Sequence, residues 1–180
     1  MTSNRVLKLE IPKNGRLERY LKELTPIFEH FEYSTKSDLE SFMWRVFDDC
    51  MNYLKEVLGA TFPNIMVNAI YKEEEWAELQ KKVERVFGPQ PYSMAMIIGS
   101  GPNAIINIYV PDHYTGNALS FIVNLCSSYF EELIHSINPE KTETETQEPV
   151  WSAIEGFLEI KLSDESKKEG LRRAKLYDSL

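Results

Sequence analysis

The chain has 180 residues, a net charge of −8 and a pI near 5.0, and 43% of its residues are hydrophobic. This length is sufficient for one domain with a sizeable core, and the composition is that of a globular protein. The acidic balance argues against nucleic-acid binding, which needs a concentrated positive surface. Because the sequence contains neither a membrane-spanning apolar run nor a signal-peptide pattern, we expect a cytoplasmic protein without a membrane partner.

The N-terminal part of the sequence predicts a strand followed by two helices. Residues 1–15 contain an alternating apolar stretch and then a turn, which predicts a short strand. Residues 16–31 carry apolar side chains at helical spacing, with Pro26 inside the pattern as a kink or a division. A long helix is predicted for residues 38–58, and Gly59 ends it.

The middle of the sequence predicts three strands and one helix. Residues 64–71 predict a strand, and residues 73–87 predict a charged helix with a solvated face. Two further strands, 93–98 and 104–110, flank the glycine-containing residues 99–103. We interpret those residues as a hairpin turn, because a phosphate-binding loop would be followed by a helix and here a strand follows.

The C-terminal part predicts helices with one interruption. A helix is predicted for residues 117–137, and Pro139 lies just beyond it. Residues 138–149 are polar and repetitive, so we expect a mobile loop within the domain. A further helix is predicted from Glu148 onward, and residues 163–180 predict a charged C-terminal helix or tail.

This order of elements predicts an α+β fold in a single domain that spans residues 1–180. We expect a small mixed or antiparallel sheet packed on helices. The two cysteines, Cys50 and Cys126, each fall in a helical pattern, so we expect buried thiols in a reducing compartment. A disulfide or a catalytic cysteine is the alternative.

Three polar residues near the end of the predicted helix 117–137 are candidates for a site. Between residues 86 and 130 the only formal charge is Asp112, and then Glu131, Glu132 and His135 follow. Glu131 and His135 project side by side at i and i+4, on a face that lacks lysine and arginine. Two ligands on one helix face beside a further carboxylate is the geometry of a helical metal site. The alternative is an ordinary helix end, where a histidine suits the helix dipole.

The next predicted helix adds another carboxylate. Glu155 lies nearest the centre of the apolar face of that helix, and a carboxylate at a buried margin needs a partner. The candidates for that partner are a metal ion, His135, or an arginine such as Arg172 or Arg173.

Residues 130–137, with the sequence Phe-Glu-Glu-Leu-Ile-His-Ser-Ile, resemble the active-site helix of the zincin metallopeptidases, whose signature is H-E-x-x-H. The spacing from His135 to Glu155 is similar to that of the third ligand in the gluzincin branch. The resemblance implies a zincin-like fold. It also implies that strand 104–110 is the edge strand bordering a substrate cleft, and that helix 38–58 backs the signature helix.

The resemblance further implies that Glu131, His135 and Glu155 are metal ligands and that Glu132 is the general base. Glu131 stands where the signature has its first histidine, so the motif is degenerate. A Glu-His-Glu set would bind zinc more weakly than His-His-Glu and would suit manganese or iron at least as well. An additional anionic ligand also makes a metal-bound water less acidic, which weakens hydrolysis.

These observations predict a zincin-fold protein whose degenerate metal site is catalytically impaired or inactive, and which serves for structure or for binding a peptide or protein partner. The alternative is a metal-dependent peptide hydrolase that carries Zn, Mn or Fe and uses Glu132 as the general base. A remote alternative is a di-iron carboxylate protein, because Glu132 and His135 match one half of that motif. The second Glu-x-x-His that this motif requires is missing from the sequence.

Overall fold

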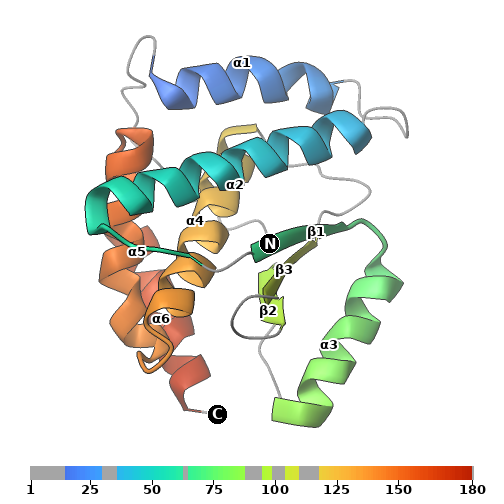
Figure 1. Cartoon of the computed structure of the whole chain (residues 1–180), viewed down its shortest axis with the longest axis vertical. Coiled ribbons are helices and arrows are strands. Elements are labelled where there is room, and N and C mark those ends of the chain that lie inside the picture. Colours follow the sequence, from blue (N-terminus) through green and yellow to red (C-terminus); the bar gives the residue numbers. More distant parts are fainter. Residues whose placement is uncertain are drawn as a thin grey trace.

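The computed structural model describes residues 15–29, 36–62, 65–87, 95–98, 104–109 and 118–179 (Figure 1). The described helices are α1 (Arg16–Glu29), α2 (Lys36–Leu58), α3 (Glu73–Phe87), α4 (Ala118–Ile137), α5 (Glu143–Leu158) and α6 (Asp164–Asp178). The described strands are β1 (Ile65–Ile70), β2 (Ala95–Ile98) and β3 (Ala104–Tyr109). The strand predicted within residues 1–15 and the turn predicted at residues 99–103 lie outside the described residues.

The strands form a small mixed sheet in the order β1-β3-β2. β1 runs parallel to β3, with Asn68 opposite Asn107, whereas β2 runs antiparallel to β3. The sheet is therefore mixed, which is one of the two forms that the sequence predicted, and the predicted antiparallel pairing of the last two strands is confirmed. The expectation that strand 104–110 is an edge strand is wrong, because β3 has a paired neighbour on both sides.

Most of the helices pack against one face of this sheet, and α3 packs at one end of the other face, where Met66 stays exposed. Val67, Ile106 and Ile108 point from one face into the main core, which also contains buried side chains of α1, α2, α4 and α5. On the other face, α3 places Trp76 against Tyr109, and the two rings stack with centroids 5.7 Å apart. The molecule thus has the α+β architecture that the order of elements predicted.

Helix α4 lies at the centre of the main core and contacts α1, α2 and α5. Its Tyr129 is fully buried and donates a hydrogen bond of 3.0 Å to the backbone oxygen of Met43 on α2. Cys126 on α4 and Cys50 on α2 are both buried and free, which confirms the prediction of buried thiols. No helix in the described part of the chain is both long enough and apolar enough to cross a membrane.

The prediction of a mobile loop over residues 138–149 is wrong from residue 143 onward, because α5 begins at Glu143. Thr142 is the N-cap of α5 and forms a capping box with Glu145, which stabilises a helix start at this position. Pro149 consequently lies inside α5 rather than near its first turn. The charged C-terminal segment is helical from Asp164 to Asp178, with Ser163 as its N-cap.

Candidate metal centre

The last two turns of α4 carry the polar residues that the sequence singled out. Helical geometry places Glu131 and His135 one turn apart on the same side, as their spacing predicted. Both side chains are half-buried at the margin of the core, and Glu132 is half-buried beside them. These residues end a helix whose other described positions carry no formal charge, so their polarity is concentrated at one place.

The chain reverses direction directly after α4 and brings a further carboxylate to this place. The amide of Asn138 bonds to the carbonyl of Ile134 at 3.0 Å, and the amide of Lys141 bonds to the carbonyl of Asn138 at 3.1 Å. This tight connection sets the first turn of α5 against the last turn of α4. Glu143 therefore joins Glu131 and His135, and one potential ligand atom from each lies within 4.8 Å of the others.

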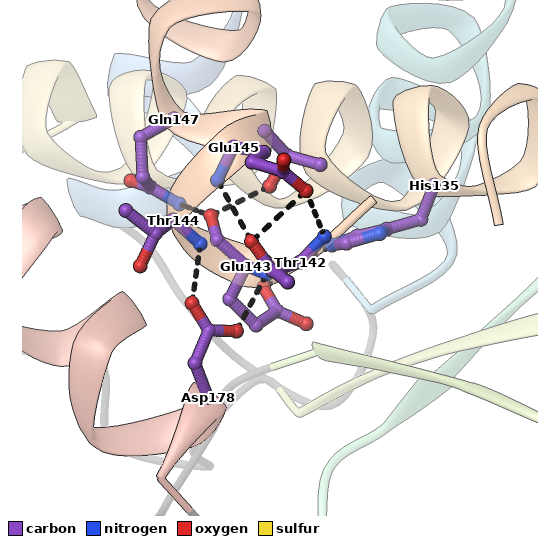
Figure 2. Close-up of polar contacts among 8 residues, drawn as sticks. His135, Thr142, Glu143, Thr144, Glu145, Gln147 and Asp178 are labelled. Atoms are coloured by element: carbon purple, nitrogen blue, oxygen red, sulfur yellow. Dashed lines mark hydrogen bonds and ion pairs between the residues drawn. The ribbon is translucent and has the colours of Figure 1, made fainter. Parts of the chain in front are cut away.

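One short contact in this cluster joins His135 to Glu143. The Nε2 atom of His135 lies 3.1 Å from Oε2 of Glu143, and Figure 2 shows the two side chains facing each other. The Nε2 atom is buried, yet no group in the described part of the chain makes an aligned hydrogen bond with it. A buried imidazole nitrogen without such a bond is unfavourable unless another partner is supplied.

The start of α5 is fixed by a second carboxylate, that of Asp178 at the end of α6. The amide of Glu143 donates to Oδ1 of Asp178 at 2.8 Å, and the amide of Thr144 donates to Oδ2 at 2.9 Å (Figure 2). The capping box contributes two further bonds, in which Thr142 and Glu145 each accept from the other's amide at 3.2 and 2.9 Å. The backbone around Glu143 is thus fixed by two sets of hydrogen bonds, one to Asp178 and one within the capping box.

Burial raises the proton affinity of two carboxyl groups in this cluster. Burial, reinforced by the charge and contact of Glu143, raises the pKa of Glu131 to about 7. Burial and the charge of Glu131 raise the pKa of Glu132 to about 8, although the nearby His135 acts in the opposite direction. In the metal-free protein at neutral pH, these two carboxyl groups therefore hold a large share of their protons.

The two partners of the short contact are shifted towards their charged forms. Burial alone would lower the pKa of His135, but the contact with Glu143 and the surrounding carboxylates raise it above its ordinary value. Burial would raise the pKa of Glu143, yet its contacts with His135 and Glu131 lower it. The cluster without a metal therefore favours the charged forms of His135 and Glu143, beside two carboxyl groups that keep their protons to a higher pH than usual.

The donor set fits a divalent transition metal. Two carboxylates and one imidazole suit zinc, manganese and iron. Metal–donor distances of about 2.0–2.2 Å place neighbouring donors roughly 3–4 Å apart, and the 3.1 Å between His135 and Glu143 falls in that range. A metal ion would give the buried Nε2 of His135 a direct ligand bond in place of its poorly aligned 3.1 Å contact with Glu143. The cluster of Glu131, His135 and Glu143 can therefore hold a metal ion.

The structure does not bring Glu155 into this cluster, contrary to the expectation from its spacing. Its Oε1 atom accepts from the amide of Leu162 at 2.9 Å and lies 2.9 Å from Nζ of Lys167. These contacts arise because α5 ends in a left-handed turn at Glu159, after which the chain passes back alongside Glu155. The carboxylate of Glu155 is therefore paired with Lys167 and with the backbone amide of Leu162. Glu143, and not Glu155, is the third residue of the cluster.

Sequence reasoning missed Glu143 and its support from Asp178. The signal that could have found Glu143 is the sequence Thr142-Glu-Thr-Glu145, which is that of a capping box and predicts a helix start. Comparison with protein-family models, with curated proteins and with solved structures finds no match to this chain. The chemistry of the cluster itself is therefore the guide to the function of this chain.

Proposed function

We propose that this chain is a metal-binding protein in which Glu131, His135 and Glu143 hold one divalent transition-metal ion. The observation that carries the proposal is the convergence of these three side chains around a buried imidazole nitrogen that lacks an aligned hydrogen bond. A cation would neutralise the carboxylates that the fold buries together, and it would displace the protons that they hold in its absence.

The role that this arrangement favours is structural or binding rather than hydrolytic. The ion would join the last turn of α4 to the first turn of α5, and so fix the chain reversal between them. Two anionic ligands reduce the Lewis acidity of a bound metal, which makes a metal-bound water a weaker acid. The zincin-like fold stays a hypothesis that rests on residues 130–137, and a peptide or protein partner is part of the same hypothesis.

A metal-dependent peptide hydrolase is a second candidate, and one observation favours it. Glu132 lies beside the cluster, and burial raises its pKa to about 8, close to the pH at which a general base or acid works best. Peptide hydrolysis by protein supplied with Zn²⁺ or Mn²⁺, and abolished in Glu132→Gln, would establish this candidate. Equal rates in the wild type and Glu132→Gln would exclude Glu132 as the base.

The proposed function is tested by metal content and metal titration. Protein purified without chelators is analysed for bound metal, and chelator-treated protein is then titrated calorimetrically with Zn²⁺ and Mn²⁺. We expect one ion per chain in the wild type and a loss of binding in His135→Ala. Glu140→Gln is the control, because Glu140 is an exposed carboxylate in the same connection between helices. Absence of binding by the wild type, or full binding by His135→Ala, would refute the proposal.

A further inference from the structure

The carboxyl end of α6 returns to the position where α5 begins. Figure 2 shows Asp178 below the first turn of α5, with its carboxylate directed at two consecutive backbone amides. These amides belong to Glu143 and Thr144, at 2.8 and 2.9 Å. The backbone of Glu143, one of the proposed ligands, is therefore hydrogen-bonded to a residue of α6.

The first three backbone amides of α5 donate hydrogen bonds either to Asp178 or to the N-cap residue Thr142. Thr142 accepts from the amide of Glu145, the third residue of the helix, and leaves the amides of the first two residues without a partner from the capping box. Asp178 satisfies both of them. Two bonds from one planar carboxylate fix the orientation of the peptide that carries Glu143, and hence the direction in which its side chain leaves the helix towards His135.

The packing of α6 on α5 places Asp178 at this position. Gly170 of α6 lies against Gln147 and Trp151 of α5 so closely that a Cβ at residue 170 would lie 3.0 Å from the side-chain oxygen of Gln147. Towards the other end of the pair, Lys167 of α6 contacts Glu155 of α5 at 2.9 Å. Asp178 can therefore reach the amides of Glu143 and Thr144 only while α6 is packed along α5.

We propose that Asp178 is a positioning residue for the metal centre, which sets Glu143 for the cation and makes cation binding and the docking of α6 mutually dependent. This inference rests on the proposed function. A residue that orients a ligand without touching the metal typically changes metal affinity by roughly 10–100-fold when it is removed. Coupling between two binding events is reciprocal, so the cation in turn stabilises the docked position of α6.

A purely structural role of Asp178 as a helix cap makes a different prediction. Loss of an ordinary cap lowers global stability and leaves the affinity of the folded protein for a cation unchanged. Ser163→Ala provides the matched control, because it removes the cap of α6, in which Ser163 accepts from the amide of Ser166 at 3.2 Å. The hydrogen bonds of Ser163 in the described structure join it to Ser166 and Lys167 of its own helix.

The experiment compares Mn²⁺ affinity and the Co²⁺ absorption spectrum of the wild type, Asp178→Ala, Asp178→Asn, Asp178→Glu and Ser163→Ala, at a temperature where each is folded. We expect Asp178→Ala to bind Mn²⁺ roughly 10–100-fold more weakly and to alter the Co²⁺ spectrum. Asp178→Asn keeps one acceptor oxygen, so it tests the same point if the alanine variant does not fold. Asp178→Glu should restore part of the affinity, and Ser163→Ala should match the wild type.

Hydrogen exchange provides the reciprocal test. Saturating Mn²⁺ should slow amide exchange along α6 in the wild type and should do so much less in Asp178→Ala. If Asp178→Ala and Asp178→Asn bind Mn²⁺ as tightly as Ser163→Ala, Asp178 is only a cap and the inference is wrong. If the wild type binds neither Mn²⁺ nor Co²⁺, the proposed function itself fails and the inference fails with it.

Discussion

His135 on α4 and Glu143 on α5 meet across a short connection, with Nε2 and Oε2 3.1 Å apart. This contact joins the residue that ends the polar pattern of α4 to a residue in a segment that the sequence suggested was a loop. It brings the half-buried His135, Glu143 and Glu131 into one cluster, with Glu132 nearby.

Replacement of Glu132 should change how stability depends on pH. The pKa of Glu132 is raised from 4.5 in the unfolded chain to about 8 in the folded protein. The folded state therefore binds more protons between these values, and the stability that this group contributes at low pH is lost as pH rises through 8. The glutamine side chain in Glu132→Gln is neutral at every pH, so this variant should not lose stability at position 132 as pH rises.

Urea unfolding in the presence of a chelator measures this effect. One pKa unit corresponds to about 1.4 kcal/mol, and coupling to Glu131 reduces the effect of a single replacement. We expect the free energy of unfolding of Glu132→Gln to exceed that of the wild type by about 2 kcal/mol at pH near 8.5. At pH near 5 the two free energies should differ little. A difference that is the same at both pH values would contradict the assignment of a buried, proton-holding carboxyl group.

The charge state of His135 should depend on Glu143. Burial acts to lower the pKa of His135, and the contact with Glu143 is the largest influence that raises it. NMR titration of the His135 ring in metal-free protein should therefore give a lower pKa in Glu143→Gln than in the wild type. Glu155→Gln serves as the control, because Glu155 contacts Lys167 instead. An unchanged pKa in Glu143→Gln would show that the contact is absent in solution.

Removal of the N-cap of α5 should destabilise the protein. Thr142→Ala loses the bond from the amide of Glu145, and such a loss costs about 1 kcal/mol. Thermal unfolding followed by circular dichroism measures the effect. Thr25→Ala is the control, because Thr25 is an exposed threonine inside α1 and alanine is the better helix former. Equal melting temperatures for Thr142→Ala and the wild type would indicate that residues 143–149 are not stably helical.

Much of this fold follows from local pattern, and that is why it was predictable. The apolar spacing in α2 and α4 repeats over many turns, so both helices and the shared face of Glu131 and His135 were predicted close to where they lie. A small mixed or antiparallel sheet was also predicted, but the central position of β3 was not. Strand order is a property of the whole chain path, which alternation along one strand does not encode.

The remaining part of the site depends on contacts between distant residues. Glu155 was predicted as a ligand from its spacing to His135, but spacing does not reveal that Lys167 and Leu162 turn back to bind it. Glu143 was not predicted as a site residue, because it lies in a polar repeat whose composition suggested a loop. The bonds that hold it come partly from Asp178, at the far end of the next helix, and no local pattern near residue 143 indicates them.

The close packing around Gly156 provides a test of the core between α2 and α5. A Cβ at this position would overlap the hydroxyl of Tyr53, whose ring is packed edge-to-face against Phe130 and Phe157. Alanine would otherwise favour the helix by about 1 kcal/mol. We expect Gly156→Ala to lower the free energy of unfolding by roughly 1–3 kcal/mol, because overpacking outweighs helix propensity.

The same substitution in a second background isolates the cause. In Tyr53→Phe the hydroxyl is gone, so adding Gly156→Ala should be neutral or stabilising when both are measured by urea unfolding. If Gly156→Ala stabilises the protein in both backgrounds, α5 does not approach Tyr53 as closely as the structure places it.

The most direct test of the account is a calorimetric titration with Mn²⁺ of chelator-treated wild type, Glu143→Gln and Glu155→Gln. The two variants make the same chemical change on the same helix, and only Glu143 belongs to the cluster with Glu131 and His135. We predict that Glu155→Gln, which loses only a contact between α5 and α6, binds one ion with at most a small loss of affinity, and that Glu143→Gln binds at least about 10-fold more weakly. Retention of binding by Glu143→Gln together with its loss in Glu155→Gln would contradict the account.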